Sequence, residues 1–220
     1  MEQEFEVLQT KTGQVVVKKM RQRILDYSKY FLSYEEAKKM KDTALSFGQK
    51  ANIYYCLISL MLNCGLRRSE ARKLKIEQIN MTNMRVELGV DTKTRTPRQI
   101  PFSENLKMQL LAVIANRTSG FVFMHDSKGR SKKSYSDAQI NNIVATVGAK
   151  AGIMPKSDGL KNVNPHLLRH SWVKFCQKAG IDKNNVRVMG GWKTMKMIDL
   201  IYGVPDYETI SNEYNAKMNW

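Results

Sequence analysis

Residues 165–171 read Pro-His-Leu-Leu-Arg-His-Ser, and this heptapeptide predicts the start of a helix that favours an anion. Pro165 suits the first position of a helix, where its missing N–H is not needed. His166 and Arg169 are then three residues apart, so an imidazole and a guanidinium project from one side near the helix N-terminus. That end of a helix attracts anions through its free amides and its dipole. Two of the chain's three histidines fall in this segment, and the alternative for each is an ordinary buried histidine with satisfied hydrogen bonds.

Three further features flank this segment in order along the chain. Upstream, Arg67 and Glu70 lie one turn apart on a predicted helix. Lys93 stands at the tip of a predicted hairpin, where an ammonium can reach a phosphate or a base edge. Downstream, the segment 190–194, Gly-Gly-Trp-Lys-Thr, is followed by Tyr202. Taken singly, each feature has an ordinary explanation: a solvated ion pair, a solvated loop, or a packed tyrosine.

The hydrophobic pattern predicts a mainly α-helical fold with a small antiparallel β-sheet, that is, the α+β class. Ser33, with a Glu three residues later, forms a capping-box pattern that starts the first helix, and Gly48 is its predicted stop. The stretches 84–88 and 98–102 alternate with period two, as the strands of a hairpin do, and 121–123 is a candidate third strand. The predicted helices are 33–47, 52–63, a short one from Ser69, 104–116, 136–150, 165–179, 184–189, 194–201 and, after Pro205, an amphipathic tail at 206–220.

The length of 220 residues suggests one domain, or one domain with an appendage. We expect residues 1–30 to be a basic N-terminal appendage or linker and residues 31–220 to form the domain, including the tail helix. A content of 42% hydrophobic and 25% charged residues argues against disordered and collagen-like chains. The apolar runs are too short to span a membrane, and the acidic, polar start does not read as a signal peptide, so we expect a cytoplasmic protein.

The charge balance points to a polyanionic partner. The chain has 36 Lys and Arg against 20 Asp and Glu, which gives a net charge of +16. Its sequence pI is about 9.8, and nucleic acid is the first candidate for such a basic chain. Cys56, Cys64 and Cys176 are odd in number, without metal-ligand spacing, and are expected to behave as small hydrophobic residues.

Together and in order, these motifs resemble the catalytic domain of the tyrosine recombinases, also called the phage integrase family. The resemblance covers roughly residues 31–207. It implies the fold of the DNA breaking and rejoining enzymes and a site-specific recombinase or integrase, of the kind carried by viruses and mobile elements. The matching residues are Gly65-Leu66-Arg67-Arg68-Ser69-Glu70, Lys93, His166-Leu167-Leu168-Arg169-His170, Gly191-Trp192 and Tyr202.

The resemblance implies a role for each matching residue. Arg67 and Arg169 would grip the non-bridging oxygens of a DNA phosphate, a task that suits guanidinium forks. Tyr202 would be the nucleophile, and His166 would accept or donate its proton. Lys93 would protonate the departing 5′-oxygen as a general acid. The product would be a 3′-phosphotyrosyl intermediate, formed without metal or ATP, so no cofactor is expected.

Two departures from the family pattern leave alternatives open. The family usually has His where the local motif places Trp192, while strict spacing from the tyrosine selects Lys193; both carry a donor that can hold a phosphate oxygen. Residues 1–30 are also too few for the separate core-binding domain of the family, so we expect a catalytic fragment or a minimal enzyme.

The expected partner is double-stranded DNA, bound by a homotetramer, with a monomer possible when the protein is free. Two other functions share these features: a type IB topoisomerase, and an inactive DNA-binding regulator with the same fold. Further basic side chains are expected to neutralise DNA phosphates in a salt-dependent way. These predicted DNA contacts are Lys18, Lys19, Arg21, Arg95, Arg98, Lys128, Arg130, Lys132 and Lys133.

Overall fold

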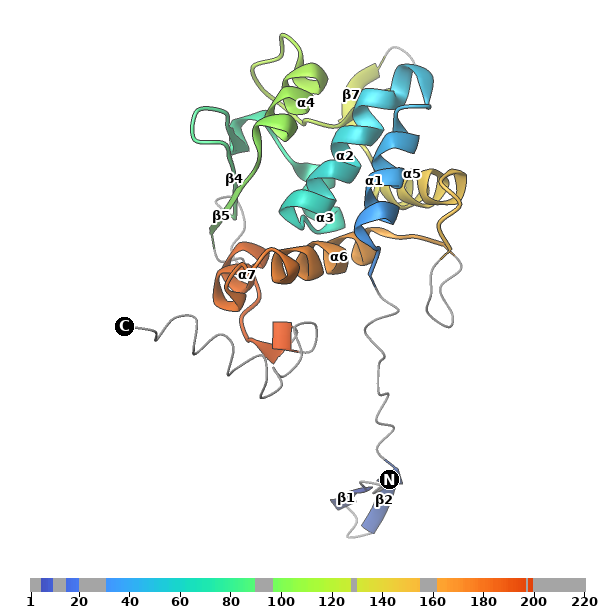
Figure 1. Ribbon diagram of the computed structural model, residues 1–220, viewed down its shortest axis with the longest axis vertical. Helices are drawn as coiled ribbons and strands as arrows, with labels where there is room; N and C mark the ends of the chain where they lie inside the picture. The colour runs from blue at the N-terminus through green and yellow to red at the C-terminus, as the bar shows by residue number, and fades with distance from the viewer. Residues whose placement is uncertain are drawn as a thin grey trace, which may run out of the picture.

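A computed structural model of the chain describes residues 31–89, 97–127, 130–154, 162–196 and 198–199, and two strands near the N-terminus, 5–9 and 15–19. In the two N-terminal strands and at 125–127 and 130–132, it describes the backbone alone. Within this part of the chain, seven α-helices surround one core, and a three-stranded antiparallel sheet lies at its side (Figure 1). The predicted α+β class is confirmed.

Helix α1 (Tyr34–Ala44) begins as its sequence predicts. The amide of Glu36 donates to Ser33 Oγ at 3.1 Å, and the amide of Ser33 donates to Glu36 Oε2 at 2.7 Å, which completes the capping box. The helix ends before its predicted stop at Gly48. After Ala44 the backbone amides bond to the carbonyl three residues back, so the chain tightens into turns that lead to a 3₁₀ turn at Gly48–Lys50.

Helix α2 (Ala51–Cys64) forms the centre of the core. Most of its second half is fully buried between α1, α4 (Glu104–Ile114) and α6 (Pro165–Lys178). Each fully buried aliphatic side chain of this kind contributes about 1.5–3 kcal/mol to stability. The helix ends at Gly65, whose φ of +58° lies in the left-handed region that favours glycine.

The predicted hairpin is confirmed as strands β4 (Arg85–Leu88) and β5 (Arg98–Pro101), which pair antiparallel. The third strand of the sheet is β3 (Ile79–Asn80), so the prediction for 121–123 was wrong. Segment 121–123 instead packs beside the end of α3 (Arg68–Lys73): the Val122 amide donates to the carbonyl of Leu74 at 2.8 Å. That contact joins residues far apart in sequence, which a local alternation pattern does not report.

Two further ribbons were not predicted as hairpins. Strand β1 (Phe5–Gln9) pairs with β2 (Val15–Lys19), and β6 (Met124–Ser127) pairs with β7 (Arg130–Ser134). The second ribbon carries Arg130, Lys132 and Lys133, which were predicted as DNA contacts without a secondary structure of their own.

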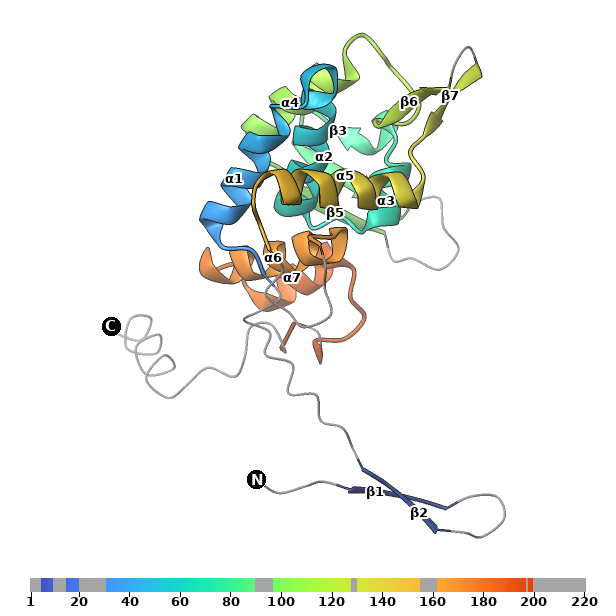
Figure 2. The same cartoon turned by 90° about the vertical axis from the view of Figure 1, so that its right-hand side faces the viewer.

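Three later helices complete the body: α5 (Asp137–Lys150), α6, and α7 (Lys183–Gly190). Figures 1 and 2 show α6 crossing the molecule beneath α2, α3 and α5, with α7 beside it. Of the predicted helix 194–201, residues 196, 198 and 199 are helical, and the tail 206–220 lies outside the described residues. No helix in the described part of the chain is long and apolar enough to cross a membrane.

Candidate active site

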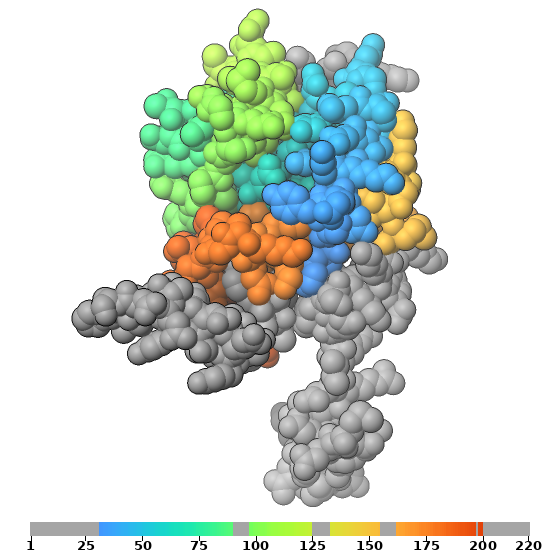
Figure 3. Space-filling view, viewed as in Figure 1, coloured from blue at the N-terminus to red at the C-terminus, as the bar shows by residue number. Residues whose placement is uncertain are grey.

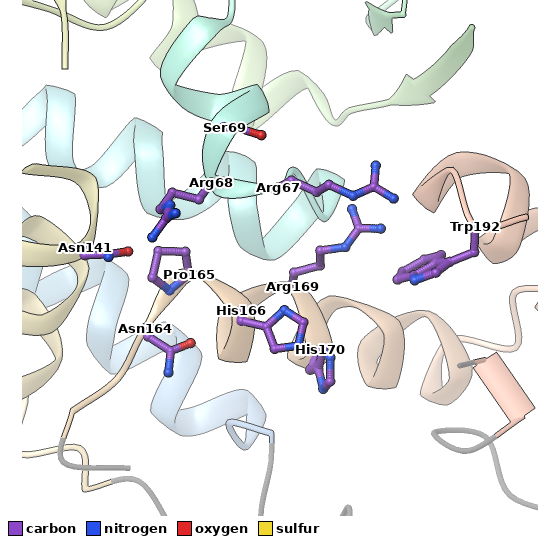
Figure 4. Close-up of a pocket in the computed structure, with 10 residues that line it drawn as sticks. All are labelled: Arg67, Arg68, Ser69, Asn141, Asn164, Pro165, His166, Arg169, His170 and Trp192. Carbon is purple, nitrogen blue, oxygen red and sulfur yellow. The ribbon is translucent and has the colours of Figure 1, made fainter. Parts of the chain in front are cut away.

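An open pocket of about 560 Å³ lies where the N-termini of α3 and α6 face each other, with Trp192 at one side (Figure 4). Four of the predicted catalytic residues contribute to it from three separate segments. Its lining residues are Arg67, Arg68, Ser69, Asn141, Asn164, Pro165, His166, Arg169, His170 and Trp192.

Arg67 precedes the first turn of α3 and is held by a buried carboxylate. Its Nη1 donates to Glu70 Oε1 at 2.8 Å, its amide donates to Glu70 Oε2 at 2.7 Å, and its Nη2 donates to the Gly191 carbonyl at 2.9 Å. Arg67 and Glu70 lie one turn apart as predicted, but the Glu70 side chain is only 3% exposed, so the two do not form a solvated surface pair. A guanidinium has five N–H donors, and these side-chain bonds use two of them, which leaves donors for a phosphate.

Arg169 is held by backbone carbonyls. Its Nη1 donates to the carbonyl of Gly65 and its Nη2 donates to the carbonyl of Gly190 at 2.6 Å. Burial, together with the charge of Arg67, lowers the pKa of Arg169 to about 9, so the group stays charged at neutral pH. Figure 4 shows the guanidiniums of Arg67 and Arg169 next to each other on the side that faces Trp192.

His166 and His170 lie one turn apart on α6 with ring centroids 4.1 Å apart. Desolvation by the surrounding protein, with the nearby charge of Arg169, lowers the pKa of His166. Burial and the proximity of His166 lower the pKa of His170 to about 4. Both imidazoles are therefore neutral at pH 7, and His166, at the exposed mouth of the pocket, can accept a proton.

Trp192, and not Lys193, lines the pocket. The Arg169 guanidinium lies over the Trp192 ring at 4.0 Å, a cation–π contact, and Trp172 stacks with Trp192 at 6.3 Å between centroids. Gly190 makes room for the indole, because a Cβ there would lie 1.7 Å from a ring atom. Lys193 is exposed to solvent.

Several predicted site residues lie outside what the structure describes, and they stay predictions. Lys93 and Tyr202 are among them. The predicted DNA contacts Arg21, Arg95 and Lys128 also lie outside the described residues. For Lys18, Lys19, Arg130 and Lys132 the structure describes only the strand backbone. Lys133 lies on β7 and is exposed.

The prediction that Arg98 contacts DNA needs correction. Its side chain is 3% exposed, its Nη2 donates to Glu70 Oε2 at 2.8 Å, and its Nε donates to the carbonyl of Met189 at 2.8 Å. A guanidinium enclosed in this way cannot reach a phosphate on the surface. The hairpin position suggested exposure, but Arg98 points from β5 into the protein.

The pocket also contains residues that the sequence analysis did not assign. Arg68 and Ser69 fall inside the first motif and His170 inside the heptapeptide, so proximity to the motifs was a usable signal. Asn141 comes from α5, far away in sequence, and no local pattern marks it. Among the described residues, no group of three or more His, Cys, Asp or Glu side chains is placed to hold a metal ion.

Most of the chain matches a known protein family. The model of the phage integrase family matches residues 30–208. The chain belongs to the phage integrase family. Its curated relatives include tyrosine recombinase XerA of Pyrococcus furiosus, 34% identical over 156 residues, which covers 69% of this chain and 49% of that protein. Tyrosine recombinase XerC of Chlorobaculum tepidum is 26% identical over 189 residues, 77% of this chain and 55% of the relative.

Solved structures of a recombinase and of an integrase share the fold. The XerH recombinase bound to its difH substrate has a TM-score of 0.69 at 18% identity, covering 94% of this chain and 58% of that one. The catalytic domain of bacteriophage HP1 integrase has a TM-score of 0.57 at 18% identity, covering 86% of this chain and 96% of the other. The chain spans about half the length of the curated relatives, 49% and 55%.

Proposed function

We propose that this chain carries the catalytic centre of a site-specific DNA recombinase or integrase that works through a 3′-phosphotyrosyl intermediate. The observation that carries the proposal is the open pocket in which Arg67 and Arg169 lie together beside His166. Two guanidiniums, one from the residue that precedes α3 and one from α6, match the charge and the donor geometry that a phosphodiester requires. Related folds have been crystallised with DNA: XerH with its difH substrate and the Tn1549 integrase with transposon DNA.

In the proposed reaction one bond forms and one breaks. The phenol oxygen of Tyr202 attacks the phosphorus, the bond to the 5′-oxygen breaks, and the phosphate stays attached through its 3′-oxygen. The phenol proton passes to His166, whose lowered pKa keeps its imidazole neutral at pH 7. Lys93 gives a proton to the leaving 5′-oxygen. A 5′-hydroxyl of another strand then reverses the step, and no external energy is needed because the phosphotyrosyl bond replaces a phosphodiester.

The pocket stabilises the charge that develops on the phosphate. Arg67 and Arg169 hold the non-bridging oxygens with donors that are fixed before the substrate binds, which is usually the largest electrostatic contribution to catalysis. Trp192, rather than Lys193, fills the position usually held by His, because the indole lines the pocket and the Lys193 ammonium does not.

On DNA we propose a homotetramer in which the tail, 206–220, docks on a neighbouring protomer. The tail sequence has an apolar stripe at helical spacing, and a helix of that length needs a surface to cover it. A groove of about 480 Å³ between α1, α2, α4 and α6 supports this, because apolar side chains such as Leu62, Phe102 and Phe175 are among its lining residues and Tyr34 at its edge is 65% exposed. Figure 3 shows the surfaces of α1, α4 and the α6–α7 region meeting on one face.

A pool of nicked duplexes with randomised sequence tests the function. Cleavage beside the nick releases a short strand that diffuses away, so a covalent protein–DNA complex accumulates. The unmodified chain should form this complex, while Tyr202→Phe should bind DNA equally well and form none. Tyr207→Phe and Tyr214→Phe are matched controls that should still form it.

The result that contradicts the assignment is an adduct in Tyr202→Phe, because another tyrosine would then be the nucleophile. The same substrates separate the proposed recombinase from a type IB topoisomerase: a recombinase joins the cleaved strand to a second duplex, and a topoisomerase reseals it within the first.

A further inference from the structure

The end of helix α7 is a meeting point for three arginines from three different elements. Its last carbonyls are consecutive, and each accepts a hydrogen bond from a different guanidinium. The three bonds are Arg98 Nε to Met189 O at 2.8 Å, Arg169 Nη2 to Gly190 O at 2.6 Å, and Arg67 Nη2 to Gly191 O at 2.9 Å. Two of these guanidiniums line the pocket, and that of Arg98 does not.

A helix C-terminus is a favourable place to bind arginine side chains. Its last carbonyls have no partner within the helix, and its dipole places partial negative charge there, which favours cations. Gly191 has a φ of +66°, so the chain turns away at the end of α7. A Cβ at Gly191 would lie 3.1 Å from atoms of the Arg98 side chain, so the close approach of Arg98 depends on the glycine.

Arg98 also reaches the carboxylate that holds Arg67. The Arg98–Glu70 pair is buried, with both side chains 3% exposed and 2.8 Å between the two atoms. Burial would raise the pKa of Glu70, but the charge of Arg98 and the hydrogen bonds from Arg98 and Arg67 outweigh it, so the pKa is lowered and Glu70 is an anion. One carboxylate thus sits between a pocket arginine and a buried one.

We propose that Arg98 is the positioning residue of the arginine pair. Through Glu70 it fixes Arg67, and through the end of α7 it fixes the carbonyls that hold both pocket arginines. This inference rests on the proposed function, in which those two guanidiniums bind the scissile phosphate. Arg98 stands five residues after Lys93, so it also ties the strand that follows the predicted general acid to the arginine pair.

Loss of Arg98 has two physical consequences. The buried Glu70 carboxylate loses a cation and competes more strongly with phosphate for Arg67. The end of α7 loses its bond to β5, so the carbonyl acceptors of Arg67 and Arg169 are less well fixed. A misplacement of about 1 Å at reacting groups can reduce a rate about 100-fold, whereas DNA binding depends on many phosphate contacts and changes little.

The test is single-turnover cleavage of a nicked duplex that the unmodified chain cleaves. Arg98→Met should cleave about 100-fold more slowly, with less than about a threefold change in the dissociation constant for DNA. Arg85→Met is the matched control: Arg85 pairs with Glu87 at 2.7 Å on the adjacent strand β4, but about one third of each side chain is exposed. That variant should cleave at the rate of the unmodified chain.

A second substitution separates positioning from packing. Glu70→Gln in the Arg98→Met background removes the carboxylate that has lost its cation. The double variant should therefore cleave at least about tenfold faster than Arg98→Met, whereas a packing defect alone would give no such recovery. Equal rates for Arg98→Met and the unmodified chain, or no recovery in the double variant, would overturn the proposal.

Arginine Nε–Hε signals in ¹⁵N NMR spectra give a readout that needs no activity. The signals of Arg67 and Arg169 should move in Arg98→Met and stay in place in Arg85→Met; unmoved signals in both would overturn the positioning role. If the unmodified chain forms no covalent complex, the proposed function fails, while these NMR signals still decide whether Arg98 positions the arginine pair.

If Arg98→Met does not fold, Arg98→Lys is the variant to test. A single ammonium cannot span Glu70 and the Met189 carbonyl, so we expect slower cleavage and moved signals. Unchanged cleavage and unmoved signals would refute the proposal.

Discussion

Replacing Gly65 by alanine should destabilise the fold by about 2–5 kcal/mol, because two penalties combine at this position. Gly65 has a φ of +58°, where a side chain costs about 1–2 kcal/mol. The new Cβ would also lie 2.1 Å from a ring atom of Trp172, which is only 3% exposed. A ring packed in the core cannot move aside freely, and overpacking of this kind costs about 1–3 kcal/mol.

Gly48→Ala is the matched control, because Gly48 has a φ of +55° but no atom within 4 Å of the added Cβ. Urea denaturation of both variants should show a loss for Gly65→Ala that exceeds the loss for Gly48→Ala by about 1–3 kcal/mol. Cleavage should slow only in Gly65→Ala, since the Gly65 carbonyl accepts a bond from Arg169 and Trp172 stacks with Trp192. Equal losses in the two variants would refute the packing argument.

Three further predictions follow from the site. As pH falls from 6.5 towards 4, His170 should lower the free energy of unfolding by about 3 kcal/mol. The reason is that its pKa is about 4 in the folded chain, so the unfolded chain protonates it first. His170→Gln should make the free energy of unfolding less dependent on pH between 6.5 and 4, as measured in denaturation curves, and an unchanged dependence would contradict the role of His170. Lys93→Ala should slow cleavage far more than it weakens DNA binding, and a 5′-bridging sulfur should restore much of the rate; without that rescue Lys93 is not the general acid. Truncation after Tyr207 should leave monomers that bind DNA but form no tetramers or strand-exchange products in native gels, and unchanged tetramers would exclude tail exchange.

Much of the fold was predictable because its signals are local. The Ser33 capping box, Gly65 at the end of α2 and Pro165 at the start of α6 each act within a few residues of their position in the sequence. The hairpin β4–β5 was equally readable from its period of two. The order of the motifs predicted that distant residues share one site, and four of them, Arg67, His166, Arg169 and Trp192, line the same pocket; Lys93 and Tyr202 stay predictions.

Two of the failures involve contacts between distant residues. Arg98 was assigned to DNA because it is basic and close to a hairpin tip, but its partner Glu70 lies 28 residues away and makes it a buried residue. Segment 121–123 has strand-like residues, yet it joins no sheet: Phe121 forms an isolated bridge with Lys75, and the Val122 amide donates to the Leu74 carbonyl at the end of α3. Whether a basic or apolar stretch is enclosed depends on which element packs against it, and the stretch itself does not carry that information.

The acceptors that fix the arginines explain why the sequence does not show how these side chains are held, and why the pocket suits an anion. Each guanidinium donates to a backbone carbonyl that is distant in sequence: 124 residues away for Arg67, 91 for Arg98 and up to 104 for Arg169. Because every residue carries a backbone carbonyl, the sequence does not mark these acceptors. A neutral carbonyl restrains a guanidinium without cancelling its charge, as a second carboxylate would. Among the described residues of this cluster, three guanidiniums face one carboxylate, that of Glu70, so the positive charges outnumber the negative ones by two. Those charges are held in place before any ligand arrives, so a phosphate that enters the pocket meets fixed donors, and no carboxylate is among the described residues that line it.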